Sequence, residues 1–193
     1  MSEEHKKINR WVIADTHFAH KNILAYEDRP FVDLEEQREI LIANWNSVVA
    51  PDDIVYMLGD FTLTRKKDLI KSIVDRLNGK IVLVMGNHDT LKPKDYIELG
   101  FVTAIRKPIM VEPNVILMHE PPKKEDIIPG VRYIFGHVHS KRCDADSSPW
   151  CYCVSVERIR YKPVELERVL KIIGRKLETF KESEEDSDEH TVL

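Results

Sequence analysis

Five short apolar runs, each followed at once by a polar cluster, constrain the fold of this 193-residue chain more than any other feature. Apolar runs of this length are typical of buried strands, so each cluster marks a strand end. The runs cover residues 11–14, 54–58, 81–85, 115–117 and 133–135. The clusters behind them supply Asp15, His17, Asp60, Asn87, His88, Asp89, His119, His137 and His139. Ligands of α/β folds lie outside the carboxyl ends of the strands, so we expect these side chains to converge on one small volume.

The order of the elements predicts an α/β fold. Helices are expected between the first strands, over 33–49, 64–77 (with Thr64 as the N-cap) and 93–99. The pattern then changes to short strands, expected over 101–105, 109–111, 115–117, 131–135, 152–156 and 159–161, before a last helix over 164–177. This order is typical of two mixed sheets packed face to face and flanked by helices, a four-layer α/β/β/α sandwich.

Charge divides the chain into a body and a tail. Residues 178–193 hold seven acids and one lysine, whereas residues 1–177 hold 28 basic and 26 acidic side chains, a net charge of +2. We therefore predict a single domain over 1–177 and an acidic, disordered tail over 178–193. A body so close to neutrality gives no strong electrostatic support for nucleic-acid binding, although DNA or RNA ends are not excluded.

The apolar runs and the cysteines indicate the cellular compartment of the protein. No run approaches the roughly 18 residues of a membrane span, and the first residues do not resemble a signal peptide, which favours the cytoplasm. The three cysteines, Cys143, Cys151 and Cys153, lie in one late segment. An odd number argues against a disulfide framework, and reduced thiols are favoured over a small zinc site because the spacing follows no zinc-binding rule.

The polar clusters contain the side chains that bind transition metals. Mixed oxygen and nitrogen ligands suit manganese, iron, zinc or nickel better than magnesium or calcium. A single catalytic zinc takes about three protein ligands. Seven candidates are present here: Asp15, His17, Asp60, Asn87, His119, His137 and His139. Seven ligands fit two metals that share one carboxylate, an arrangement used for attack at phosphorus.

Each cluster also has an ordinary structural explanation. A histidine after an apolar strand, such as His119, is more often a packed or surface residue, and a pair such as Gly59-Asp60 is commonly a turn. The occurrence of all five clusters in one chain, each at a strand end, favours the metal site.

The clusters resemble the signature of the calcineurin-like metallophosphoesterases. The shared motifs are Asp-x-His at 15–17, Gly-Asp at 59–60, Gly-Asn-His-Asp at 86–89, His119 and Gly-His-x-His at 136–139. Further segments are similar to a compact prokaryotic or phage-type branch of that family, over 15–23, 29–31, 77–80 and 161–164. One departure is Glu120, at a position where that branch often has an aromatic residue.

The resemblance implies a place for each ligand around two divalent ions, with Mn²⁺ favoured and Fe, Zn or Ni as alternatives. One ion would be held by Asp15, His17, Asp60 and His139. The other would be held by Asp60, Asn87, His119 and His137, so that Asp60 is the bridge. His88 would act as general acid and protonate the leaving oxygen, with Asp89 orienting its ring.

The implied activity is metal-dependent hydrolysis of phosphate esters, above all small phosphodiesters including nucleotides, through attack by a hydroxide that bridges the metals. His20, Asn22 and Arg29 are candidate substrate contacts. The alternatives are a nuclease that acts on DNA or RNA ends and a non-catalytic interaction scaffold on the same fold. The presence of His88 argues against the scaffold. No membrane partner is expected, and the oligomeric state is not determined by the sequence.

Overall fold

The computed structural model describes residues 7–189 of the chain, with side chains described up to residue 180. Its first sheet has five strands in the order β4-β3-β2-β1-β9. The bounds are β1 Arg10–Ile13, β2 Ile54–Met57, β3 Lys80–Val84, β4 Thr103–Ile105 and β9 Val164–Glu165. Strands β1 to β4 run parallel to their neighbours, and only β9 is antiparallel. The carboxyl ends of β1, β2 and β3 therefore lie on one edge of the sheet.

The second sheet has four strands in the order β5-β6-β7-β8. These are β5 Ile109–Glu112, β6 Val115–Leu117, β7 Arg132–Phe135 and β8 Cys151–Cys153. The β5–β6 pair is antiparallel, whereas β6, β7 and β8 are parallel. The two sheets meet where β1 ends, because the amide of Ala14 donates to the carbonyl of Val154 (2.9 Å) and the amide of Val156 donates to that of Ala14 (3.1 Å).

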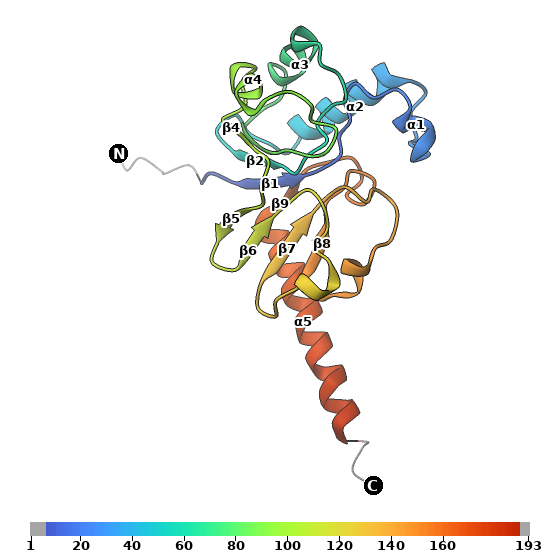
Figure 1. Cartoon of the computed structure of the whole chain (residues 1–193), viewed down its shortest axis with the longest axis vertical. Coiled ribbons are helices and arrows are strands. Elements are labelled where there is room, and N and C mark those ends of the chain that lie inside the picture. Colours follow the sequence, from blue (N-terminus) through green and yellow to red (C-terminus); the bar gives the residue numbers. More distant parts are fainter. Residues whose placement is uncertain (1–6, 190–193) are drawn as a thin grey trace, which may run out of the picture.

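The helices complete the architecture (Figure 1). Four of them lie on the side of the first sheet away from the second: α1 Ile23–Tyr26, α2 Leu34–Asn46, α3 Lys67–Val74 and α4 Pro93–Glu98. The long helix α5, Leu166–Glu189, packs along β1, β9 and β8. Two short 3₁₀ helices, η1 Lys124–Asp126 and η2 Asp144–Ser147, accompany the second sheet. The prediction of an α/β fold with two packed mixed sheets and flanking helices is confirmed.

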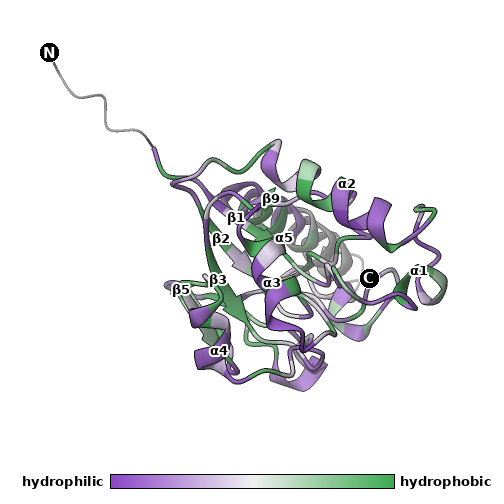
Figure 2. Cartoon of the chain, turned by 90° about the horizontal axis from the view of Figure 1, so that it is seen from above, coloured by the Kyte–Doolittle hydropathy of each residue, from purple (hydrophilic) through white to green (hydrophobic). Residues whose placement is uncertain are grey.

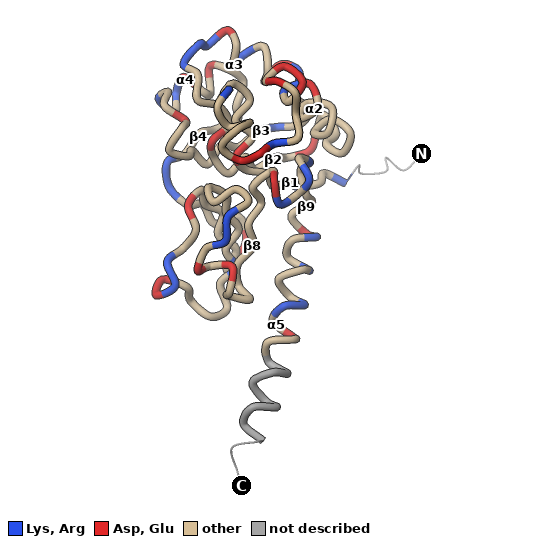
Figure 3. The backbone as a smooth tube through the Cα atoms, turned by 90° about the vertical axis from the view of Figure 1, so that its right-hand side faces the viewer, with Lys and Arg blue, Asp and Glu red and all other residues tan. Residues whose placement is uncertain are grey.

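Side-chain alternation places the second sheet between two cores. Ile134 points into the main core, which also holds Trp45 of α2 and the apolar residues of the first sheet. Its neighbours Tyr133 and Phe135 point to the opposite face, into a smaller core that contains Cys151 and Cys153. Figure 2 shows apolar strands (green) in the interior and polar residues (purple) on the outer faces of α2 and α3. Figure 3 shows that Lys/Arg and Asp/Glu positions follow one another in short stretches along the backbone.

The start of α2 and both ends of α4 agree with the prediction within one residue, whereas α2 and α3 end at Asn46 and Val74 rather than at the predicted 49 and 77. The Asp33 carboxylate accepts from the amide of Glu36 (2.8 Å) and begins α2. The prediction of Thr64 as an N-cap is wrong. The Thr64 hydroxyl instead accepts from the amide of Lys66 (3.2 Å), so a turn precedes α3, which begins at Lys67.

Two boundaries near the C-terminus also differ. The strand expected over 159–161 is a turn in which Arg160 and Tyr161 both have φ of 57°. The last helix is predicted to end near Leu177, but α5 continues to Glu189 through a stretch rich in glutamate, a good helix former. The backbone over 178–189 is helical in the structure, and 190–193 lie outside the described residues, so the acidic, disordered tail over 178–193 stays a prediction. Separation of the segment from the domain stays a prediction.

Two further expectations concern the state of the cysteines and the absence of a membrane span. All three cysteines are free. Burial raises the pKa of Cys151 and of Cys153 to about 11, which keeps both protonated within the smaller core. Within residues 7–189, no helix combines the length and the apolar composition needed to cross a membrane.

Candidate metal centre

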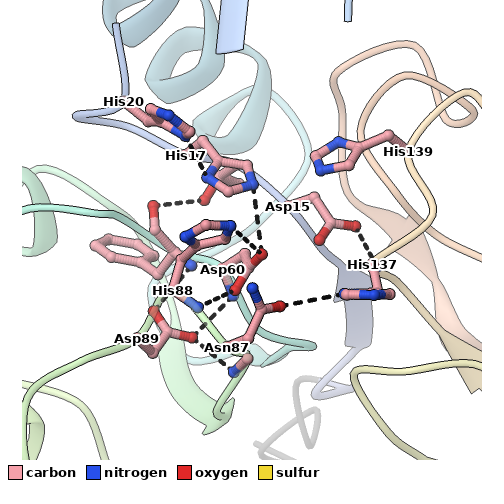
Figure 4. A network of polar contacts seen from close by, with 12 residues as sticks. Asp15, His17, His20, Asp60, Asn87, His88, Asp89, His137 and His139 are labelled. Carbon is pink, nitrogen blue, oxygen red and sulfur yellow. Dashed lines mark hydrogen bonds and ion pairs between the residues drawn. The ribbon is translucent and has the colours of Figure 1, made fainter. Parts of the chain in front are cut away.

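The five polar clusters lie at the ends of β1, β2, β3, β6 and β7, as the sequence predicts. Figure 4 shows their side chains pointing toward one another from both sheets. All seven predicted ligands are brought into this space: Asp15, His17, Asp60, Asn87, His119, His137 and His139.

The backbone at these strand ends has an uncommon conformation. Among the described residues, nine that are not glycine have positive φ, and five of them are predicted ligands: Asp15, His17, Asp60, His137 and His139. Such left-handed positions cost free energy and persist where surrounding contacts impose them. Their concentration at one site indicates that the turns are shaped to aim side chains inward.

Three glycines leave room for the ligands. A Cβ added to Gly59 would overlap the His119 imidazole, and one added to Gly86 would overlap the Asp60 carboxylate. A Cβ on Gly136 would overlap the Cβ of Ala14 and lie 2.7 Å from Asp15 Oδ2. The Gly-Asp, Gly-Asn-His-Asp and Gly-His-x-His motifs therefore need glycine for close approach rather than for a turn alone.

Gly136→Ala should displace Asp15 and weaken metal binding, since the new methyl group meets the carboxylate directly. Gly174→Ala is the matched control, because a Cβ there meets nothing within 4 Å and alanine favours the helix by up to about 1 kcal/mol. Metal binding by both variants is measured as the change in melting temperature on adding Mn²⁺. The expected shift is smaller than wild type in Gly136→Ala and unchanged in Gly174→Ala. An unchanged shift in both would refute the close-approach argument.

One group of ligands comprises Asp15, His17 and His139, whose ligand atoms lie within 4.8 Å of one another. Asp15 Oδ2 accepts from the Ser155 hydroxyl (2.6 Å) and from the amide of His137 (2.9 Å). By contrast, Asp15 Oδ1 and His17 Nε2 are buried and have no hydrogen-bond partner. Buried polar atoms are normally hydrogen-bonded, so two without a partner are expected where a cation binds.

The second group comprises Asp60, His119 and His137, also within 4.8 Å of one another. The Nδ1–H of His119 is placed to donate to the Leu58 carbonyl (2.9 Å), which leaves the Nε2 lone pair to face the Asn87 Oδ1 (3.0 Å). His137 Nδ1 lies 3.1 Å from the same Nε2. Acceptors that face one another at these distances are stabilised when a cation lies between them.

Asp60, a member of the second group, also reaches the first group. Its Oδ2 is 3.5 Å from His17 Nε2, and its Oδ1 is 3.6 Å from His119 Nε2. One carboxylate thus reaches both sets of ligands, the geometry that a bridging ligand requires.

Electrostatics within the first group favour a bound cation. Burial raises the pKa of Asp15 to about 7, because an ionised carboxylate is poorly solvated there. Burial, together with His139 and Arg29, lowers the pKa of His17 well below its usual value and keeps its imidazole neutral. Burial lowers the pKa of His139 too, but the hydrogen bond to Glu157 and the charge of Asp15 outweigh it and raise this pKa above its usual value. The mixed oxygen and nitrogen donors fit a divalent transition metal.

His88 and Asp89 occupy different environments. The His88 ring is 36% exposed, with Nε2 3.9 Å from Asp60 Oδ2, and it lies toward His17 (Figure 4). Asp89 is buried, and its carboxylate accepts from the amides of Asp60 (2.8 Å), Phe61 (3.1 Å) and Gly86 (2.9 Å). We expected Asp89 to orient the His88 ring. Its carboxylate instead ties together the turns after β2 and β3.

Arg29 does not contact the space around the ligands, contrary to its prediction as a substrate contact. Its side chain is fully buried, and its nitrogens donate to the carbonyls of Asp15 (2.7 Å) and Thr16 (3.0 Å) and to the side chains of Gln37 (2.9 Å) and Glu157 (2.7 and 2.9 Å). These five contacts use all five N–H donors of a guanidinium. Arg29 therefore stabilises the backbone of the first cluster from the protein interior.

Arg29→Met should destabilise the protein by about 3–5 kcal/mol, the usual cost of breaking a buried ion pair, because Glu157 loses its partner. Arg76→Met is the control, since Arg76 pairs with Glu39 on the surface. Urea unfolding with a chelator present measures the difference. If Arg29→Met instead has a normal unfolding midpoint and a raised KM, Arg29 contacts the substrate as first predicted.

Two residues that the sequence did not single out contact the predicted metal ligands. Ser155 bonds to Asp15, and Glu157 Oε1 accepts from His139 Nδ1 (3.0 Å) while it pairs with Arg29. Neither belongs to a cluster at a strand end. The only signal is their position in 152–156 and just beyond it, a segment expected to be a strand whose partners the sequence does not reveal.

Glu157→Gln should weaken the first ion by about 10–100-fold, the typical effect of losing a carboxylate that orients a ligand histidine. The second ion is the internal control, because His119 is oriented by the Leu58 carbonyl instead. Calorimetric titration of the metal-free variant with Mn²⁺ measures the affinity for each of the two ions. Equal weakening of both ions would indicate general destabilisation and contradict the orienting role.

The other two candidate substrate contacts are placed differently from Arg29. His20 is almost fully buried, with its Nδ1 3.3 Å from His17 Nδ1 and its ring centroid 5.7 Å from that of His88. Asn22 is exposed and precedes α1. His20 thus borders the site, whereas a role for Asn22 stays a prediction.

Comparison with known proteins agrees with this geometry. The family model described as calcineurin-like phosphoesterase matches residues 8–111, which contain the first three clusters. The uncharacterized protein MJ1445 of Methanocaldococcus jannaschii is 36% identical over 86% of this chain and 91% of its own length. The Gene 66 protein of Mycobacterium phage L5 is 33% identical over 44% of this chain and 42% of its own. The crystal structure of AQ665 from Aquifex aeolicus, a protein of unknown function, is similar with a TM-score of 0.69 and 27% identity, covering 86% of this chain and all of that one.

Proposed function

Because the chain belongs to the calcineurin-like phosphoesterase family, we propose that it is a dinuclear-metal phosphodiesterase. The observation that carries the proposal is the double ligand group joined by Asp60, with buried unpartnered atoms at Asp15 and His17. Family membership suggests hydrolysis of phosphate esters in general. The number of ions, the preference for diesters and the roles below are the proposal.

Each part of the site has a role in that reaction. Asp15, His17, Asp60 and His139 would hold one cation, and Asp60, Asn87, His119 and His137 the other. Bound there, two divalent cations lower the pKa of water and neutralise charge on the phosphoryl oxygens. His88 gives a proton to the leaving oxygen, because its ring is partly exposed and adjoins Asp60.

A small substrate is supported by the surroundings of the site. The side chains of Asn87 and His88 reach the surface, so an ester can approach both without passing through a deep channel. The net charge of +2 over residues 1–177 gives little support to a nuclease, which would need an excess of basic side chains for the phosphate backbone. Three free cysteines support a reducing compartment such as the cytoplasm.

The direct test is hydrolysis of bis(4-nitrophenyl) phosphate and 4-nitrophenyl phosphate with Mn²⁺, Fe²⁺, Zn²⁺ or Ni²⁺ added to the metal-free protein. Cyclic nucleotides and single-stranded oligonucleotides serve as further substrates, and a chelator is the control. The proposal expects metal-dependent turnover that is faster with the diester. Faster monoester turnover would make the protein a phosphatase, and no turnover with any metal would favour the interaction scaffold.

A further inference from the structure

A groove of about 420 Å³ adjoins the second ligand group. This volume lies in the usual range of small-molecule sites, about 300–1,000 Å³. Asn87 and His119 belong to its lining, so the groove begins at the metal ligands. Its apolar walls include Met85, Pro108 and Met118.

The same groove carries three exposed ionic side chains, Arg106, Lys107 and Glu120. One nitrogen of Arg106 donates to the Leu91 carbonyl (3.0 Å), which fixes the guanidinium and leaves its other donors available. Within residues 7–180, Lys107 and Glu120 form no ion pair with each other or with Arg106. Two cations and one acid, unpaired beside metal ligands, give the groove an excess of positive charge.

The location of His88 decides which part of a diester enters the groove. His88 does not line it and lies instead toward His17 and His20, with ring centroids 5.2 and 5.7 Å away. The leaving oxygen must lie near His88 to receive its proton. The groove, on the Asn87 and His119 side, is therefore placed to receive the ester arm that stays on phosphorus.

We infer that this groove is a substrate subsite for the retained arm, and that Arg106 and Lys107 select diesters whose retained arm ends in a second anionic group. The inference rests on the proposed phosphodiester hydrolysis. In that reaction the oxygen of water forms a bond to phosphorus, and the bond from phosphorus to the leaving oxygen breaks. The products are an alcohol, protonated by His88, and a monoester that keeps the anionic arm.

The apolar walls add a second requirement. Met85 and Met118 contact the part of the arm between phosphorus and the distal anion, so a flat or apolar body fits better than a polar one. The ligand class is thus a small phosphodiester with an apolar or aromatic retained arm and a carboxylate or phosphate at its far end.

A matched pair of esters tests the selection: 4-carboxyphenyl 4-nitrophenyl phosphate and phenyl 4-nitrophenyl phosphate. Both release 4-nitrophenolate, and only the first has an anionic retained arm. The wild type should prefer the carboxylate ester by about five-fold in kcat/KM, the scale of one or two exposed ion pairs. Arg106→Ala and Lys107→Ala should each reduce this preference, mainly through KM, and Glu120→Gln should increase it. Lys71→Ala, on the surface of α3, is the control and should keep it.

A preference that is unchanged in both Arg106→Ala and Lys107→Ala, while the phenyl ester is hydrolysed normally, would overturn the subsite and leave the proposed function intact. Binding of phenylphosphonate and 4-carboxyphenylphosphonate, measured by calorimetry, gives a readout that needs no turnover. If neither ester is hydrolysed but the carboxylate ligand still binds more tightly and loses this advantage in Arg106→Ala, the subsite stands and the proposed reaction fails. Equal binding of the two phosphonates would overturn the inference.

Discussion

His88→Ala is expected to lose about 10²–10⁴-fold in kcat while it keeps both metal ions, the usual contribution of a general acid. Its ring belongs to neither of the two candidate ligand groups described above and is more exposed than the predicted ligands Asp15, His17 and Asp60, which are buried. The link between His88 and the metal centre runs through the backbone, because the His88 amide donates to Asp60 Oδ1 (2.9 Å), and alanine preserves that bond.

The choice of leaving group makes this prediction specific. A diester that releases 4-nitrophenolate needs little protonation, so it should lose far less in His88→Ala than a diester that releases an alkoxide. Metal content should equal that of the wild type. Loss of the ions from this variant, or an equal loss of turnover with both leaving groups, would contradict the role of general acid.

Asp60→Asn should weaken both ions at once and abolish most turnover. The change keeps the shape of the side chain and its acceptor for the His88 amide, but it removes the charge that lies 3.5 Å from His17 and 3.6 Å from His119. Changes that only disturb the orientation of a ligand cost about 10–100-fold in metal affinity, so the loss of a direct, shared ligand should exceed about 100-fold for each ion.

The matched control is Asp68→Asn, which removes one carboxylate from the exposed surface of α3. Calorimetry with Mn²⁺ reports both affinities in the same titration. If Asp60→Asn retains one ion with wild-type affinity, Asp60 belongs to a single site and the bridge is wrong.

The sequence predicted the strands well where a buried apolar run is followed directly by a polar cluster. An apolar run that ends in Asp, Asn or His has one strong interpretation, because such groups are unfavourable in a sheet core and favourable at its edge. The strands β6 Val115–Leu117 and β7 Arg132–Phe135 were predicted within one residue for this reason. The structure adds the reason for the glycines in these motifs, because a Cβ on Gly86 or Gly136 would overlap a neighbouring group.

The sequence was less informative where a role depends on partners distant along the chain. Arg29 looks like a surface cation beside the first cluster, yet its partner Glu157 lies 128 residues away and buries it. The segment 159–161 has the composition of a strand. Its Tyr161 ring instead packs against Phe31, with centroids 5.0 Å apart, and the Tyr161 amide donates to Val156 (2.8 Å), which closes a turn. Local propensity does not record such tertiary contacts.

The metal content of the purified wild-type chain, saturated with Mn²⁺ and freed of excess ion, tests the central claim most directly. The two ligand groups joined by Asp60 predict two ions per chain, with both lost in Asp60→Asn and both kept in His88→Ala. One ion per chain, or none, would contradict the dinuclear centre on which the proposed hydrolysis depends.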